Sequence, residues 1–528
     1  MQRWSPRCEV SKKEALLLKR LKRTRKLFAF LRLHRADLFD DDFQSELELM
    51  YRDTGAGNEP VPPAQLCMAL ILQGYMGVSD ADAVELSIVD ARWQMVLDCL
   101  GAEEPAFGQG TLQRFRQRLV AADMDRRLLE RTRELAKNSN AFDWKKLPKD
   151  LRVGVDSRPL LGAGRVEDTF NLLGHAARKL VETASYILGE DWTVICHAAG
   201  IPLLLHPSIK AGLDIDWRDP LQKDAALEML VQQVTSLNGW LEETQLSMQE
   251  PLRPYIKAIA QVHEQDLEEA AGKVRLRQGV APDRRISIED SEMRHGRKSK
   301  TKRFDGYKEH VAADLDTDLI LACAITPANV PEEEAAPELQ SDLDCQGVEI
   351  RELSVDRAYI NSTLVELVEQ RGGEIICKPW SPQNRRNLFT KMDFKIDMRS
   401  KTITCPNGEI ERFEPGQTVE FEPDACSGCT LRSQCTYAAS GRGRTVHISQ
   451  DEQRQHRLRK LQASNKGRAR IRGRTGIEHR LAHIAARKGP RARYLGVRKN
   501  LFDLRRAATI QNLETLHRVT TAAHNLAA

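Results

Sequence analysis

One stretch of the sequence, residues 151–160 (LRVGVDSRPL), constrains the fold more than any other. Apolar residues alternate along its first half, which is the pattern of a half-buried β-strand. The pattern predicts that the strand ends at Asp156 and that a turn containing proline and glycine follows over Ser157–Gly164. A carboxylate at the end of a strand is well placed to bind a metal ion, although an aspartate there also serves as an ordinary turn cap.

The elements predicted after Asp156 indicate a fold class. Three predicted helices form a helical insertion, residues 165–283, before strands resume at Ile286; they lie at Val166–Gly189, Asp219–Leu241 and Pro251–Ala271. The chain then continues with a hairpin at Phe304–Ala324 whose turn is Asp314–Asp318, an acidic helix at Pro331–Leu343, a strand at Ile350–Val355, a helix at Ser362–Gln370 and a strand at Glu374–Lys378.

This order of elements is similar to that of an RNase H-like core, an α/β fold in which helices flank a mixed sheet. The strand at residue 350 is followed directly by Asp356. Right-handed crossover connections would place this strand beside the strand at residue 151. Asp156 and Asp356 are therefore expected to share a cation.

A third acid is expected on a helix after the last strand. The segment RTGIEHRLAHIAARKGP, which opens at Arg474, has the apolar spacing of a helix and ends in Gly489-Pro490. Glu478 lies beside the apolar stripe, so that its carboxylate can face the sheet. The alternative is a simple ion pair with Arg474, four residues earlier. The catalytic core is thus expected to comprise residues 146–378 and 474–528.

Four of the eleven cysteines fall in one short segment before this helix. Residues 379–473 are too long for a connecting loop and are expected to form a small inserted domain. Cys405, Cys426, Cys429 and Cys435 supply four soft ligands, and the CSGC element has the form of a zinc knuckle. The pattern favours a zinc site over reduced structural cysteines or a redox role, and a reducing compartment disfavours disulfides.

The first 145 residues are predicted to form a helical domain. Short helices precede a basic helix, TLQRFRQRL, in which Arg114, Arg116 and Arg118 project among apolar residues. This arrangement is similar to a helix-turn-helix unit whose last helix reads DNA. A plain helical bundle would give the same pattern.

The length and the charge distribution of the chain limit the classes of protein to which it can belong. A chain of 528 residues suffices for roughly three or four domains. Its net charge of +5 conceals basic runs at Lys12–Arg35 and Arg442–Lys499 and acidic runs at Glu332–Asp344 and Glu411–Asp424. Basic stripes beside an acidic centre suit a polyanion partner, whereas either run alone is equally typical of a solvated helix face. The sequence shows neither an apolar run of membrane-spanning length nor the apolar core of a signal peptide, so a cytoplasmic protein is expected.

Several motifs resemble those of bacterial insertion-sequence transposases of the DDE class, and the resemblance covers most of the chain. VDSRPLLGAGRVEDT is similar to the family's first-acid segment, GYKEHVAAD to its second strand, SVDRAYIN to its second-acid segment and RTGIEHR to its third-acid helix. The resemblance implies that Asp156, Asp356 and Glu478 are the catalytic triad. Ile471 and Ala485 stand where related transposases often have Tyr and Lys, so the family's DNA-end contacts are not carried over to these positions.

The resemblance also implies a chemistry. Hydrolysis of a DNA phosphodiester needs an activated water and stabilisation of the departing 3′ oxygen, and two Mg²⁺ or Mn²⁺ ions held by carboxylates supply both. In the expected mechanism Asp156 bridges both ions, Asp356 holds one and Glu478 the other. Water frees a 3′ hydroxyl at the element's end, and that hydroxyl then attacks target DNA.

Double-stranded DNA, as element ends and as target, is the expected partner, and the resemblance implies a homo-oligomer on DNA. The residues expected to contact DNA are Arg114, Arg116, Arg118 and Arg474. Two alternatives stay open: another RNase H-like nuclease such as a resolvase, and a domesticated DNA-binding protein without catalysis. The first does not explain the helical amino-terminal domain, and loss of an acid would favour the second.

Overall fold

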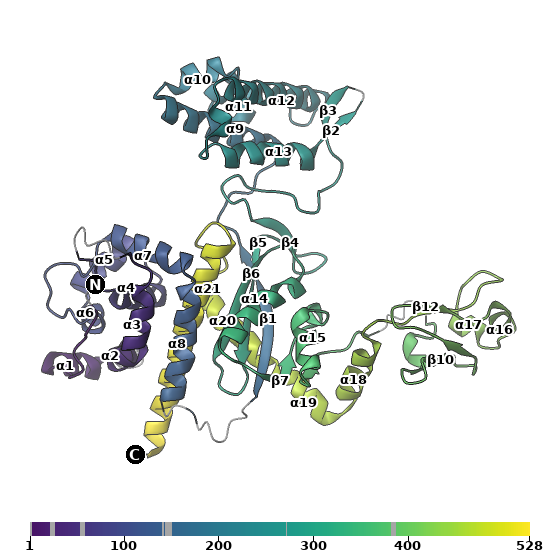
Figure 1. Cartoon of the computed structure of the whole chain (residues 1–528). Coiled ribbons are helices and arrows are strands. Elements are labelled where there is room, and N and C mark those ends of the chain that lie inside the picture. Colours follow the sequence, from purple (N-terminus) through teal and green to yellow (C-terminus); the bar gives the residue numbers. More distant parts are fainter. Residues whose placement is uncertain are drawn as a thin grey trace. The chain divides into compact units, whose positions relative to one another are not determined.

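The strand predicted at residue 151 is present and is longer than expected. In the computed structural model (Figure 1), β1 spans Leu151–Leu161, so Asp156 lies in the middle of the strand and not at its end. The predicted turn at Ser157–Gly164 is therefore wrong over its first five residues. The strand continues because neighbouring segments keep bonding to it: the Leu161 amide donates to the Pro490 carbonyl and the Gly162 amide to the Asp305 carbonyl, both at 2.8 Å.

The structure describes residues 3–21, 27–52, 59–139, 142, 150–270, 272–381 and 387–527. Two units can be distinguished. The first comprises Met1–Pro148, Asp156–Val348 and His479–Ala528, and the second comprises Lys149–Val155 and Glu349–Glu478. The domain boundary predicted between residues 145 and 146 lies outside the described residues.

The second unit holds the parallel part of the sheet. Residues 151–154 of β1 pair in parallel with β7 (Ile350–Ser354), and β7 pairs in parallel with β8 (Glu374–Ile376). Helix α15 (Thr363–Gln370) joins β7 to β8. The prediction that the strand at residue 350 lies beside the strand at residue 151 is confirmed.

The first unit holds the antiparallel part. β5 (Arg303–Asp314) pairs antiparallel with β4 (Arg294–Arg297) and β6 (Ile320–Pro327), and it is the neighbour of β1 in the strand order. This confirms the predicted hairpin at Phe304–Ala324. Gly306 has a φ of +146°, and an added Cβ would stand 2.3 Å from backbone atoms of Leu160 and Gly162, so β5 approaches β1 closely at a position that requires glycine. The strand expected at Ile286 does not form; strands resume at β4.

Eight helices precede β1 among the described residues, as predicted for this region. They are α1 (Lys12–Arg20), α2 (Leu27–Leu38), α3 (Asp41–Glu48), α4 (Pro63–Met76), α5 (Asp80–Val89), α6 (Ala91–Leu97), α7 (Gln109–Ala121) and α8 (Met124–Asn138). Local sequence starts several of them: the Ser79 hydroxyl accepts from the Asp82 amide while the Asp82 carboxylate accepts from the Ser79 amide, which is a capping box before α5.

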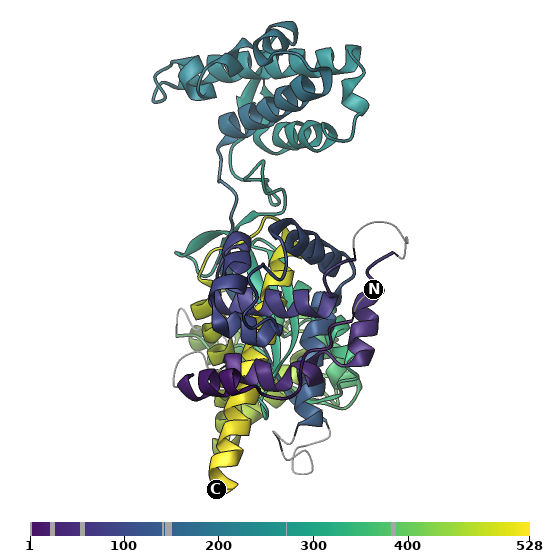
Figure 2. The same ribbon diagram turned by 90° about the vertical axis from the view of Figure 1, so that its left-hand side faces the viewer.

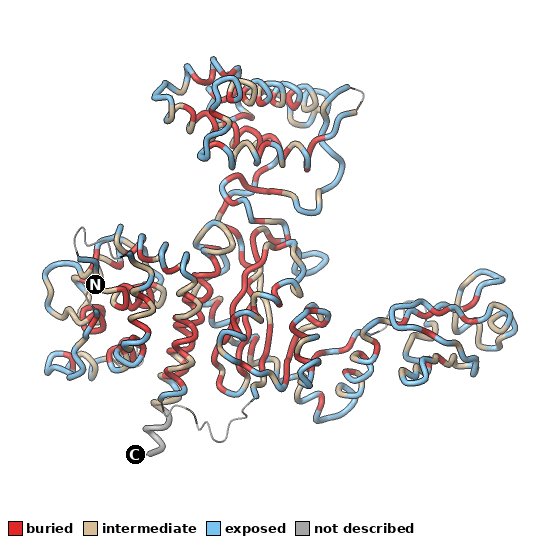
Figure 3. The backbone as a smooth tube through the Cα atoms, in the orientation of Figure 1, coloured by how far each residue is buried: buried red, intermediate tan, exposed pale blue. Residues whose placement is uncertain are grey.

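The carboxyl-terminal helix α21 (Val497–Ala527) is the centre of the first unit. Figure 3 shows that it is buried along most of its length. It packs against α4, α8 and β6, and its apolar residues complete the core of the amino-terminal helices. Asn512 is fully buried, and its amide donates to the Thr132 hydroxyl and to the Ile320 carbonyl, both at 2.8 Å.

The helical insertion after β1 has its own hydrophobic core. It contains α9 (Thr169–Leu188), α10 (Trp192–Ala198), α11 (Ile209–Leu213), α12 (Pro220–Glu243) and α13 (Arg253–Asp266). Figures 1 and 2 both show α9, α12 and α13 packed side by side. The helix predicted to run to Ala271 ends at Asp266, and Leu267–Ala270 form a strand, β2, that pairs with β3 (Lys273–Leu276).

The cysteine segment of the second unit consists of short elements. They are β9 (Lys395–Asp397), β10 (Thr402–Thr404), β11 (Ile410–Arg412), β12 (Thr418–Glu420), α16 (Pro423–Ser427), α17 (Arg432–Cys435) and β13 (Thr445–His447). Two basic helices, α18 (Glu452–Ala463) and α19 (Asn465–Gly473), lead to α20 (Thr475–Lys488). No helix in the described parts of the chain is both long and apolar enough to cross a membrane.

Candidate active site

Asp156 is partly buried on β1, directly after Val155, which is fully buried. Side chains alternate along a strand, so Asp156 and Arg158 project from the same face. The Arg158 guanidinium bonds to the Glu309 carboxylate of β5 and donates to the Gly489 carbonyl at 3.3 Å. The backbone that carries Asp156 is therefore fixed by an ion pair two residues further on.

Asp356 follows β7 and caps a short 3₁₀ turn, Arg357–Tyr359. Its carboxylate accepts a hydrogen bond of 2.6 Å from the amide of Arg357, and the residue is partly buried. Cys377 lies nearby: burial, with the charge of Asp356 adding to it, raises the pKa of this thiol to about 12. The thiol therefore stays protonated near neutral pH, and Asp356 is the acid presented at this end of β7.

Glu478 lies in the first turn of α20, and its side chain is 47% exposed. Its Oε1 accepts from Arg474 Nη2 at 2.6 Å, so the ion pair considered as the alternative is present. The pair holds the carboxylate in one orientation and leaves much of it open to solvent. The ion pair with Arg474 and metal binding by Glu478 therefore do not exclude each other.

The predicted metal sites were tested against the positions of the side chains. Among the described His, Cys, Asp and Glu residues, no three are grouped in a way that could hold a metal ion. The donor chemistry of the triad is nevertheless suitable, because carboxylate oxygens are the ligands that Mg²⁺ and Mn²⁺ prefer. The assignment of Asp156, Asp356 and Glu478 as metal ligands stays a prediction.

A buried charge cluster, which was not predicted, stands next to β1 in the first unit. It consists of Arg158, Glu309, Lys488 and Asp503. Glu309 is completely buried and accepts from Lys488 Nζ at 2.6 Å, and the same ammonium lies 3.1 Å from Asp503. Burial alone would lower the pKa of Lys488, but Glu309 and Asp503 outweigh burial and raise it, so the lysine stays charged. The signal available in the sequence was the run of polar residues Lys308-Glu309-His310 inside a predicted strand, GYKEHVAAD.

His310, the next residue on β5, gives the fold a pH dependence. Its ring is fully buried with Nε2 2.8 Å from the Thr326 hydroxyl, and burial lowers its pKa to about 3. The unfolded chain takes up this proton near pH 6.5, so stability is full above that pH and falls on acidification. We expect a loss of about 2 kcal/mol between pH 6.5 and 5 from this residue. Urea unfolding at a series of pH values should show a shallower slope for His310→Gln, and equal slopes would contradict the assignment.

The arginines of α7 differ in their surroundings. Arg116 donates to both carboxylate oxygens of Asp80, at 2.8 and 2.5 Å, and its side chain is mostly buried. Arg114 and Arg118 are exposed, with the Arg118 guanidinium 4.5 Å from the centre of the Tyr51 ring. Arg116 thus anchors α7 to α5, and the accessible cations of this helix are Arg114 and Arg118.

Several basic residues around the third acid have protein partners. Arg454 and Arg457 pair with Glu369 of α15, and Arg470 pairs with Glu352 of β7 and Glu374 of β8. These bonds fix α18 on α15 and α19 on the parallel strands β7 and β8. Other cations of the two helices are exposed, and they form a basic surface that consists of Lys460, Lys466, Arg468 and Arg472.

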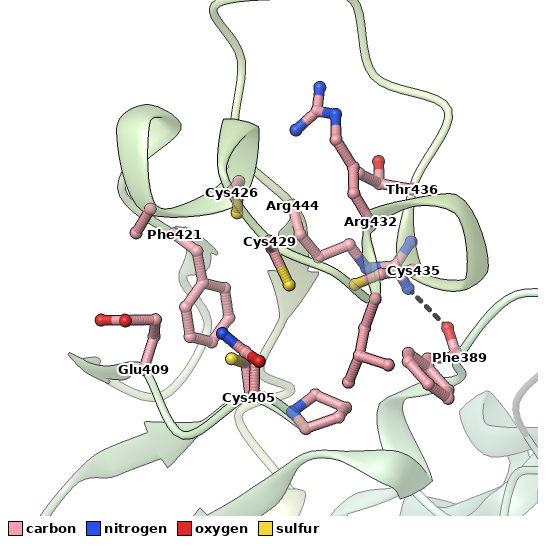
Figure 4. A pocket seen from close by; sticks show the side chains of 14 residues that line it. Phe389, Cys405, Glu409, Phe421, Cys426, Cys429, Arg432, Cys435, Thr436 and Arg444 are labelled. Atoms are coloured by element: carbon pink, nitrogen blue, oxygen red, sulfur yellow. Dashed lines mark hydrogen bonds between the residues drawn. The ribbon is translucent and has the colours of Figure 1, made fainter.

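The four clustered cysteines line one pocket in the second unit (Figure 4). All eleven cysteines of the chain are free thiols. Burial raises the pKa of Cys435, and the other three pocket cysteines add to that effect while Arg444 opposes it. We call this cavity, with Cys405, Cys426, Cys429 and Cys435, the cysteine pocket. Zinc is not supported at it by ligand geometry.

Two protein-family models match the chain. One, described as "Transposase DDE domain", matches residues 402–517, which include the cysteine pocket, Glu478 and much of α21. The other, described as "Transposase domain (DUF772)", matches residues 20–118, which include α2 to α6 and most of α7. The searches of curated proteins and of solved structures gave no match. Transposase models thus match both an amino-terminal and a carboxyl-terminal part of the chain, and these matches support an insertion-sequence DDE transposase.

Proposed function

We propose that this transposase uses Asp156, Asp356 and Glu478 to cleave DNA at the ends of its element and to join the freed 3′ hydroxyl to target DNA. The observation that carries the proposal is the register of the parallel strands. Gly154 pairs with Ser354; Asp156 lies two residues further along β1, and Asp356 lies two residues after Ser354, just past the end of β7. Glu478 lies within the segment that matches the DDE model.

The strand pattern supports an RNase H-like core. Parallel strands β1, β7 and β8 and antiparallel strands β4, β5 and β6 make a mixed sheet with flanking helices, and a helix with an acid follows the last strand. Within this proposal, residues 1–145 bind DNA, and 146–378 with 474–528 form the catalytic core. Residues 165–283 and 379–473 are insertions in that core.

Each acid would contribute oxygen ligands to Mg²⁺ or Mn²⁺. When bound, such ions lower the pKa of an attacking water and offset the charge of the departing oxygen. The contribution of the protein is to orient the carboxylates: the Arg357 amide orients Asp356, Arg474 orients Glu478, and the Arg158–Glu309 pair fixes the strand that carries Asp156. Such fixed orientation contributes to rate because the reacting groups are already aligned.

DNA binding in this proposal uses exposed cations and not the paired ones. Arg114 and Arg118 on α7 and the basic surface of α18–α19 are accessible to phosphates. Contacts of this kind supply sequence-independent affinity that weakens as salt is raised. The proposed partner is double-stranded DNA, held by more than one copy of the chain, since two element ends have to be joined.

The test is an assay of the wild-type protein with labelled DNA that carries both element ends, a target plasmid, and Mg²⁺ or Mn²⁺. Nicks that leave a 3′ hydroxyl at the ends, followed by covalent joining to the target, are the expected products. Cleavage without joining would favour a resolvase-like nuclease. End binding without cleavage under either metal would favour the DNA-binding protein without catalysis.

A further inference from the structure

The cysteine pocket is a separate feature that transposition chemistry does not use. Its volume is about 30 Å³, and apart from the sulfurs it is lined largely by apolar side chains such as Phe389, Phe421 and Leu431. Cys405 follows β10, Cys426 and Cys429 flank the end of α16, and Cys435 ends α17. Figure 4 shows these side chains reaching the pocket from separate parts of the backbone.

Two arginines at this pocket have buried nitrogens that lack a hydrogen-bond acceptor. Arg432 Nη1 and Arg444 Nε are buried and unbonded among the residues that the structure describes. Other nitrogens of the same guanidinium groups donate to the Ala438 and Phe389 carbonyls, each at 3.0 Å. Burying positive charge is costly unless negative charge compensates it. Of the two, only the Arg444 guanidinium lies beside the sulfurs in Figure 4, and Arg432 points away from them. Neutral thiols or disulfides would provide no negative charge for Arg444, whereas a zinc ion with four thiolates carries a net negative charge.

The surrounding core is small. Seven apolar side chains are fully buried there, namely Phe394, Ile403, Phe413, Val419, Phe421, Val446 and Ile448. Each of the five strands in the segment is three residues long, and α16 and α17 have five and four residues. Units of about 60 residues bury little apolar surface, and the smallest domains usually need a metal or a disulfide as an additional link.

We propose that Cys405, Cys426, Cys429 and Cys435 bind one zinc ion as thiolates, that Arg444 balances part of its charge, and that the ion stabilises this segment. The sulfurs do not stand at ligand spacing. Binding requires them to close to about 2.3 Å from the ion, and the pocket between them is the space into which they would move. An N–H group of Arg444 would then donate to a sulfur, as donors outside a metal's ligand shell commonly do.

The first experiment measures metal in the full-length protein, purified under reducing conditions after expression with zinc. One equivalent of zinc is expected by mass spectrometry, and titration of the thiols with a mercurial should release it. Cys429→Ser and Cys435→Ser should lose most of the zinc, and Cys345→Ser, an exposed cysteine outside the pocket, should keep it. Wild-type protein that contains no zinc and takes up none when Zn²⁺ is added would overturn the proposal, as would full retention of zinc by Cys429→Ser.

A second experiment does not depend on the folding of a cysteine variant. A zinc chelator should open residues 387–448 of the wild-type protein to trypsin, and added Zn²⁺ should restore resistance. Arg444→Met should weaken zinc binding about 10- to 100-fold, with partial rescue in Arg444→Lys, while Arg442→Met, which replaces a neighbouring exposed arginine, should have no effect. Cleavage that is the same with and without chelator would show that no metal stabilises the segment.

Discussion

Replacement of Asp156 by Asn, Asp356 by Asn or Glu478 by Gln should each lower end cleavage and strand joining about a thousandfold or more. Each carboxylate would hold an ion whose charge stabilisation is worth several kcal/mol in the transition state, and the amide has the same shape but lacks the charge. The side chains are partly buried or exposed, so the loss should come without unfolding. Single-turnover rates with Mg²⁺ and with Mn²⁺ are the measurement.

Two controls separate this result from a general defect. Glu366→Gln changes an exposed acid on α15 that lies outside the proposed triad and should cleave at the wild-type rate. Each triad variant should still retard end DNA in a gel, because the proposed DNA contacts are arginines and lysines. If a variant cleaves at a rate near that of the wild type, the substituted residue is not a metal ligand.

The largest effect on stability is expected at Arg505 in α21. Its side chain is 4% exposed and donates to Asp123 at 2.6 Å, to Asp125 at 3.3 Å and to Asp342 at 2.8 Å. Arg505→Met would leave the buried carboxylate of Asp342 without its main cation, whereas Asp125 keeps its ion pair with Arg498. Breaking a buried ion pair in this way typically costs about 3–5 kcal/mol. The free energy of unfolding in urea is the measurement.

A matched control lies on the same helix. Arg518 is 61% exposed and stands 3.4 Å from Asp318, so Arg518→Met should change stability by no more than about 0.5 kcal/mol. Arg505→Lys should fall between the two, because a single ammonium cannot reach several carboxylates as a guanidinium fork does. Equal stabilities of Arg505→Met and Arg518→Met would show that the aspartates find other partners.

Much of the element order could be predicted because it depends on local patterns. The alternation of apolar residues located β1. The strand-like segment Ile350–Val355, which directly precedes Asp356, located β7. The end of β1 was predicted too early because Pro159 and the following glycines indicate a turn. The strand tolerates Pro159 because pairing with β7 stops at Gly154, so no hydrogen bond to β7 depends on the N–H group that proline lacks.

Tertiary contacts explain why the helix predicted at Pro251–Ala271 ends earlier than expected. Residues 267–271 (LEEAA) have high helix propensity, yet the helix ends at Asp266. The Asp266 carboxylate accepts from the Thr169 hydroxyl and from Arg284, and the following residues pair with β3. Thr169 and Arg284 lie 97 and 18 residues from Asp266 in sequence, beyond the range of a local pattern.

The three acids of the proposed site could be selected from the sequence, but the partners of the basic residues around them could not. The three acids stood out because each follows or opens a predicted element. The carboxylates that bind Arg454 and Arg470 lie 85 to 118 residues earlier in the chain, so the basic run at Arg442–Lys499 alone indicates a polyanion partner and not these ion pairs.

The position of α21 has a consequence for synthesis on the ribosome. The apolar residues that complete the core of the amino-terminal helices include Phe502, Ile510, Leu513 and Leu516. At roughly 5–20 residues per second, the first helices emerge about 25–100 s before these residues do. Their apolar faces must wait uncovered for that time, so nascent chains and products of early termination are the species expected to aggregate or to recruit chaperones. The amino-terminal helices can therefore complete their core only after residues 502–516 of α21 have left the exit tunnel.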